Sequence, residues 1–129
     1  MPKIEDEMVS SKKNIKYINE ERANKVKELL LKNVAKKFTL YELACKIGCN
    51  EKTLNKSFKS VFNMTIFAWL RQQRLLKAMQ LLKNNPHYLP IKQIAHVCGF
   101  KYQSDFSKAF KQYFGITPTL ATQQNNYSR

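Results

Sequence analysis

The sequence predicts an all-α fold of about seven helices, in which two helix-turn-helix subdomains are joined by one long linker helix. Apolar residues recur at three-to-four-residue spacing along most of the 129-residue chain, and only three glycines and four prolines interrupt them. A block of apolar and glycine positions also occurs twice, at a nearly constant offset. Long helices with short connections fit this composition better than a turn-rich β-sandwich does.

The N-terminal part begins with a polar stretch and continues into a helix. Residues 1–19 are polar and mixed in charge, so we expect a tail or a linker remnant there. A helix is predicted from about Asn19 to Val34, because one of its faces is apolar. The apolar residues of this face are Val26, Leu29, Leu30 and Val34.

Capping signals divide the next segment into two helices. Thr39 and Glu42 form a capping box at the start of a short helix. Gly48 is expected to end it, since glycine adopts a positive φ at little cost. Asn50 can cap a following helix, predicted over residues 50–62. Its inward residues, at i, i+4 and i+8, are Leu54, Phe58 and Phe62.

A long helix is predicted after this first helix pair. Asn63 should end the preceding helix in a left-handed conformation, which asparagine tolerates. Thr65 can cap a helix that extends to about Lys83, and its apolar residues cover more than one face. That distribution is expected if the helix packs against both subdomains. We therefore assign residues 64–84 to a linker helix about 30 Å long.

The earlier pattern then returns. The apolar and glycine positions of the short helix repeat at an offset of 51, and the three inward positions of the next helix repeat at an offset of 52. The second set comprises Ile91, Ile94, Ala95, Cys98, Gly99, Phe106, Phe110 and Phe114. This repeat predicts subdomains at residues 20–63 and 85–124, with a polar tail at 125–129. Thr117 and Pro118 open a short last helix.

The charge distribution points to a polyanionic partner. The formal net charge is +14, six of the nine acids lie in the first 28 residues, and one acid, Asp105, follows Lys52. Such a field attracts nucleic acid. No apolar run approaches the roughly 20 residues that span a bilayer. The N-terminus has no signal-peptide core, so we expect a cytoplasmic protein without a membrane partner.

Catalytic, cofactor and metal sites are not predicted. His87 and His96 lie apart, and no phosphate loop, acid pair or nucleophile with an adjacent base is present. The three cysteines, an odd number without zinc-site spacing, are expected to be small, wholly or partly buried apolar residues. We therefore expect a protein that is not an enzyme.

Two candidate DNA-reading helices follow from the repeat. In a helix-turn-helix, the second helix lays its outward face in the major groove, where Asn and Gln pair with adenine and Lys with guanine. With the apolar stripes inward, residues 50–62 and 102–114 present polar outer faces. The predicted base-reading residues are Lys52, Thr53, Asn55, Lys56, Gln103, Ser104, Ser107 and Lys108. The predicted phosphate contacts are Lys59, Lys111, Tyr102 and Arg74.

These positions resemble the AraC/XylS family of transcription regulators, over about Arg22 to Thr122. The first unit is similar to the family pattern LA..G....L...F...F, the long helix to R...A..LL, and the second unit to IA...GF...S.F...F....G..P. The matching residues are Leu43, Ala44, Gly48, Leu54, Phe58, Phe62, Arg74, Ala78, Leu81, Leu82, Ile94, Ala95, Gly99, Phe100, Ser104, Phe106, Phe110, Gly115 and Pro118. Asn63 departs from the family, which usually has glycine there.

The resemblance implies a bacterial regulator that binds double-stranded promoter DNA, most often as an activator that contacts RNA polymerase. The family's base-contacting positions coincide with the outer faces described above. Family members usually carry a separate effector or dimerisation domain, so the chain is expected to be either a fragment or a stand-alone member. With two reading helices in one chain, we expect a monomer that reads two adjacent major grooves.

Two alternatives remain open at this stage. A basic helical protein could bind an anionic membrane or a protein partner through the helix from Thr65 to Lys83. That helix has a broad apolar surface and no clean amphipathic stripe. RNA is the other candidate partner, but the chain lacks a β-platform with exposed aromatic residues, and A-form grooves do not admit these helices well.

Overall fold

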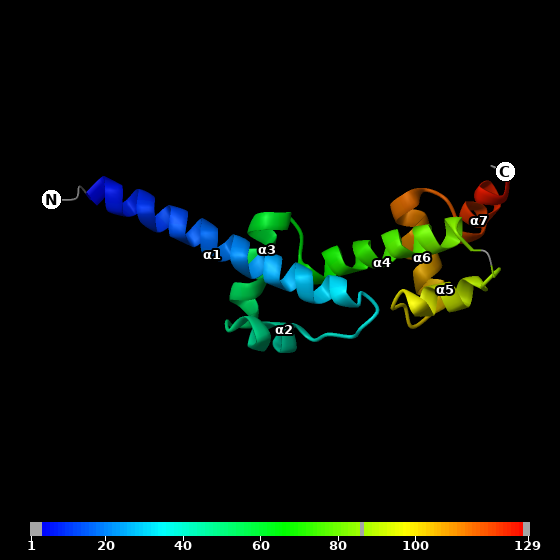
Figure 1. Cartoon of the computed structure of the whole chain (residues 1–129), viewed down its shortest axis with the longest axis horizontal. Helices are drawn as coiled ribbons and strands as arrows, with labels where there is room; N and C mark the ends of the chain where they lie inside the picture. The colour runs from blue at the N-terminus through cyan, green and yellow to red at the C-terminus, as the bar shows by residue number, and fades with distance from the viewer. Residues whose placement is uncertain (1–3, 86, 128–129) are drawn as a thin grey trace. The chain divides into compact units, whose positions relative to one another are not determined.

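The structure is a computed structural model that describes residues 4–85 and 87–127, with side chains over residues 14–85 and 87–123. The described residues form seven α-helices and no strand, as predicted (Figure 1). The helices are α1 (Ile4–Lys32), α2 (Leu40–Ile47), α3 (Glu51–Phe62), α4 (Ile66–Lys83), α5 (Ile91–Val97), α6 (Gln103–Phe114) and α7 (Pro118–Tyr127).

The chain divides into two compact units. Unit 1 comprises Met1–Lys32 and Phe38–Trp69, and unit 2 comprises Asn33–Lys37 and Leu70–Arg129. Helices α1, α2 and α3 therefore belong to unit 1, and α5, α6 and α7 to unit 2. Helix α4 contributes its first turn to unit 1 and the rest of its length to unit 2. The division thus falls inside the helix that the sequence assigned to a linker.

The core of unit 1 is built on the C-terminal half of α1, against which α2 and α3 lie (Figure 1). The α3 side chains Leu54 and Phe58 are completely buried. The ring of Phe58 meets Trp69 edge-on, at 5.8 Å between centroids. The other buried apolar residues of unit 1 are Ala23, Val26, Leu30, Leu43, Ala44 and Ile66.

Unit 2 repeats this arrangement, with α4 in the place of α1. Leu75, Ala78 and Leu82 of α4 pack against residues of α5 and α6 in one cluster. The members from the other elements are Ile94, Ala95, Cys98, Phe106, Ala109, Phe110 and Ala121. Burial raises the pKa of the Cys98 thiol to about 11, so this side chain stays protonated and acts as a small apolar residue.

The predicted capping signals are present. Thr39 Oγ1 accepts from the backbone N–H of Glu42 at 3.1 Å, and the Glu42 carboxylate accepts from the N–H of Thr39 at 3.4 Å. Thr65 Oγ1 caps α4 by accepting from the N–H of Ala68 at 3.2 Å. Asn63 ends α3 at a φ of 59°. Asparagine therefore supplies here the left-handed helix end that glycine most often provides.

Three expectations need correction. Helix α1 begins at Ile4, well before Asn19, because no proline or glycine interrupts residues 4–32. The apolar pattern in the sequence identified only the part of α1 that is buried. Side chains before that part are exposed, such as Ile15 at 59%. Helix α7 continues to Tyr127, into the expected polar tail, and Ser128 and Arg129 lie outside the described residues. Cys45 is exposed instead of buried.

A close contact in unit 2 fixes the turn between α5 and α6. Gly99 has a φ of +102°, and a Cβ there would lie 2.7 Å from Arg74 Nε and 3.0 Å from the Ala35 Cα. Arg74 Nε donates to the carbonyl oxygen of Val34 at 2.6 Å, and its Nη2 donates to that of Lys36 at 3.2 Å. The guanidinium thus ties α4 to residues 33–37 directly beside the turn.

Replacing Gly99 by Ala is expected to destabilise the protein by two effects. The positive φ costs an L-residue about 1–2 kcal/mol, and the clash with Arg74 and Ala35 adds a further ~1–3 kcal/mol. Urea unfolding followed by circular dichroism measures the total decrease in the free energy of unfolding.

Gly48→Ala is the matched control. Gly48 has a φ of +87°, but a methyl group at this position would meet no heavy atom within 4 Å, so this variant bears only the backbone cost. If both variants lose the same free energy of unfolding, the contact with Arg74 does not contribute to the effect at Gly99.

Candidate nucleic-acid interface

Helix α3 has one buried and one polar face. Asn50 Oδ1 caps the helix by accepting from the N–H of Thr53 at 2.8 Å. On the inner face, the buried Ser57 hydroxyl donates to Asn19 Oδ1 at 2.8 Å, which ties α3 to α1. The outer face carries the three lysines that the sequence predicted, all exposed: Lys52, Lys56 and Lys59. The apolar residues of α3 are buried or half-buried, so the exposed surface of this helix is mainly polar and basic.

Helix α6 has the same organisation in unit 2. Its aromatic residues form a ladder from Phe106 to Phe110 to Phe114, at 5.6 and 4.6 Å between ring centroids. The Tyr113 hydroxyl accepts from Gln72 Nε2 at 2.8 Å, which ties the end of α6 to α4. The predicted contact residues Tyr102, Gln103, Ser104, Lys108 and Lys111 are exposed, and Ser107 is half-buried.

The two helices are equivalent in position as well as in pattern. Each contains 12 residues, and α6 begins and ends at an offset of 52 from α3. Each is followed by a left-handed residue, Asn63 or Gly115. Each also has a carboxylate in its first turn, Glu51 or Asp105. The structure therefore presents one polar helical face in each unit, at the same place in the fold.

Two predicted base readers on α3 are less accessible than expected. Thr53 and Asn55 are both half-buried. The Asn55 Oδ1 atom is buried and has no hydrogen-bond partner within the described part of the chain. A buried acceptor without a partner costs free energy, so the amide oxygen of Asn55 is destabilised in this position. Periodicity alone could not detect this, because it places residues on faces without their depth.

Arg74, a predicted phosphate contact, is held by two hydrogen bonds within unit 2. Its two hydrogen bonds to the carbonyl oxygens of Val34 and Lys36 hold residues 33–37, and partial burial lowers the pKa of its guanidinium. A side chain fixed in this way has fewer donors left for a phosphate, and the phosphate contact of Arg74 stays a prediction. Glu51, which was not among the predicted contact residues, is exposed in the first turn of α3 at the position equivalent to Gln103 of α6.

Other kinds of site find no support in the described residues. Within residues 4–85 and 87–127, no group of three or more His, Cys, Asp or Glu side chains is arranged to hold a metal ion. None of the helices in that part of the chain has the length and apolar character needed to cross a membrane.

Comparison with known proteins agrees with this geometry. The family described as a helix-turn-helix domain matches residues 43–124, which include both α3 and α6. The regulator GbdR of Pseudomonas aeruginosa is 30% identical over 100 residues, which are 78% of this chain and 27% of that protein. The transcriptional activator RhaR of Salmonella schwarzengrund is 32% identical over 99 residues, 77% of this chain and 34% of that protein.

Solved structures share the fold. The DNA-binding domain of the transcriptional factor AdpA, in complex with a target DNA, superposes with a TM-score of 0.75 at 22% identity, over 83% of this chain and 95% of that one. An AraC-type regulator from Chromobacterium violaceum gives a TM-score of 0.75 at 24% identity, over 82% of this chain and 93% of that one.

The chain spans only about a quarter to a third of the length of GbdR and RhaR. Both relatives are named as transcriptional regulators and neither as an enzyme. The matched segment contains α3 and α6, whose outer faces are polar and basic. The chain therefore belongs to the AraC family of DNA-binding helix-turn-helix transcription regulators.

Proposed function

We propose that this chain activates transcription by reading two adjacent major grooves of promoter DNA, one with α3 and one with α6. The observation that carries the proposal is the equivalence of these helices: equal in length, buried on one face by apolar residues, and polar on the other. A recognition helix in the major groove needs these two faces.

The proposed readers are those that the outer faces carry. Lys52, Lys56 and Lys108 are exposed and can donate to guanine, and Gln103 is exposed and can pair with adenine. Ser104, Thr53 and Ser107 contribute hydroxyl groups. Asn55 reads a base after its amide turns out of its buried position. Lys59 and Lys111, which lie in the last turn of each helix, and Tyr102 contact phosphates.

One chain is proposed to occupy one site as a monomer. Reading helices enter successive major grooves on one face of B-DNA about 34 Å apart, or about 10 bp. Helix α4 has 18 residues and contains parts of both units. At 1.5 Å per residue its length is about 27 Å. We therefore expect a binding site of roughly 20 bp with two unlike half-sites.

Activation is proposed from the relationship to RhaR, a transcriptional activator that is 32% identical to this chain. In this proposal the bound chain contacts RNA polymerase through a surface outside α3 and α6. Selection of bound sequences from random duplexes tests the DNA-binding part. Two half-sites separated by about one helical turn support it, and enrichment of no sequence overturns it.

Gln103→Ala and Asn55→Ala are expected to relax base preference at different half-sites, each by about 1–3 kcal/mol. Asn55→Ala should also leave the stability nearly unchanged, because it removes an acceptor that has no partner. Site selection repeated with each variant measures the preference. Gln112→Ala, an exposed glutamine elsewhere on α6, is the control. Unchanged motifs in both reader variants contradict the assignment.

Lys111→Ala should weaken binding to all sequences about equally, because a phosphate contact carries no sequence information. Its loss should lower the slope of log Kd against log salt by about 0.9. Fluorescence anisotropy at several salt concentrations gives this slope for a selected site and for an unrelated duplex. Lys16→Ala, at an exposed position on α1, is the control. A loss confined to the selected site would contradict the phosphate assignment.

Glu51→Gln should tighten DNA binding. The carboxylate of Glu51 lies in the first turn of α3, where it repels the phosphates beside the groove, and Gln103 stands at the equivalent place in α6. Removing one screened like charge should raise affinity about two- to fivefold, with the larger gain at low salt. The same titration measures it, and an affinity equal to that of the wild-type chain at all salt concentrations would place Glu51 away from the phosphates.

A further inference from the structure

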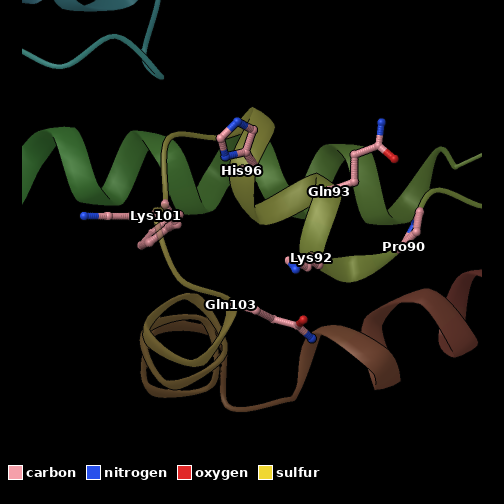
Figure 2. A pocket seen from close by; sticks show the side chains of 7 residues that line it. Pro90, Lys92, Gln93, His96, Lys101 and Gln103 are labelled. Carbon is pink, nitrogen blue, oxygen red and sulfur yellow. The ribbon is translucent and has the colours of Figure 1, made fainter.

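Unit 2 contains a pocket between α5 and the beginning of α6. Its volume is about 400 Å³. Figure 2 shows the side chains that surround it: Lys92, Gln93 and His96 from α5, Lys101 from the turn, and Gln103 from the first position of α6. The half-buried Phe100 also lines it. The pocket therefore has cationic and amide groups around an apolar floor, and none of its lining residues is an acid.

The equivalent place in unit 1 has a different chemistry. A pocket of similar volume, about 400 Å³, lies there between α2 and the start of α3. Tyr41 occupies the position of Lys92, Cys45 that of His96, and Glu51 that of Gln103. This lining has one acid and one base, Glu51 and Lys52. The hollow is thus a product of the helix-turn-helix shape, while the positive charge is particular to unit 2.

We propose that the unit 2 pocket holds a segment of the sugar–phosphate backbone beside the groove that α6 reads. This inference rests on the proposed function. Gln103 carries the argument, because it lines the pocket and is also a proposed base reader. A duplex that places a base edge against Gln103 must bring a DNA strand past the pocket. Lysines suit the phosphates and an apolar floor suits the deoxyribose carbons.

The two lysines are placed to contact separate phosphates. In Figure 2 the side chain of Lys101 extends to the left from the turn between α5 and α6, whereas the side chain of Lys92 comes from α5, at the centre of the view. Lys101 Nζ lies 5.3 Å from the centroid of the Tyr102 ring, which holds the ammonium group next to another proposed phosphate contact. Their contributions to the salt dependence should therefore add.

The test compares Lys92→Gln, Lys101→Gln and the double variant with Lys83→Gln, which removes one charge from an exposed position of unit 2 outside the pocket. Each pocket variant should lower the slope of log Kd against log salt by about 0.9, and the double variant by about 1.8. The selected site and an unrelated duplex should be affected alike. Slopes equal to that of Lys83→Gln overturn the proposal.

A second measurement locates the contact on the DNA. Neutral methylphosphonates are placed singly along the backbone that flanks the α6 half-site. One such substitution should weaken binding by the wild-type chain and have no effect on the double variant. If every methylphosphonate affects the wild-type chain and the double variant alike, the pocket does not hold the backbone. An acidic protein partner then becomes the alternative. If the wild-type chain binds no duplex at all, the proposed function itself fails, which is a separate result.

Discussion

The burial of one face of α3 and of α6 is the constraint on which the rest of this structure depends. Leu54 and Phe58 in unit 1, and Phe106 and Phe110 in unit 2, are completely buried. Each fully buried side chain of this kind contributes about 1.5–3 kcal/mol relative to exposure. Since the helices cannot rotate without exposing these side chains, their polar faces are held outward. The orientation of the candidate DNA-reading surface is therefore set by the core.

The turns and contacts around these helices differ between the two units. Both turns contain a glycine with positive φ, but Gly99 alone of the two lies against a neighbouring side chain, that of Arg74. In unit 1 a side-chain hydrogen bond from Ser57 to Asn19 ties α3 to α1. The duplicated pattern thus preserves backbone geometry and the apolar positions, while the polar contacts that support them are particular to each unit.

Charge is divided unevenly over this repeated framework. The outer face of α3 carries three exposed lysines, whereas α6 has two and unit 2 adds Lys92 and Lys101 around its pocket. In unit 1 the acid Glu51 lies at the equivalent of Gln103. The two units share one backbone arrangement but place their positive charge differently. In unit 1 the attraction to a polyanion comes mainly from the face of α3, and in unit 2 it comes from α6 and from the pocket beside it.

The repeat at offsets of 51 and 52, the capping box at Thr39 and the stripes of α3 and α6 could all be predicted from the sequence, because spacing along a helix determines which residues share a face. The depth of each side chain could not be predicted, since it depends on neighbours distant in the chain. Packing alone buried the amide oxygen of Asn55, directed Arg74 to residues 33–37, and gathered Lys92, His96 and Gln103 around one pocket. The sequence determined the fold class and the faces that meet a ligand, and the tertiary structure decided which polar groups on those faces are free to bind it.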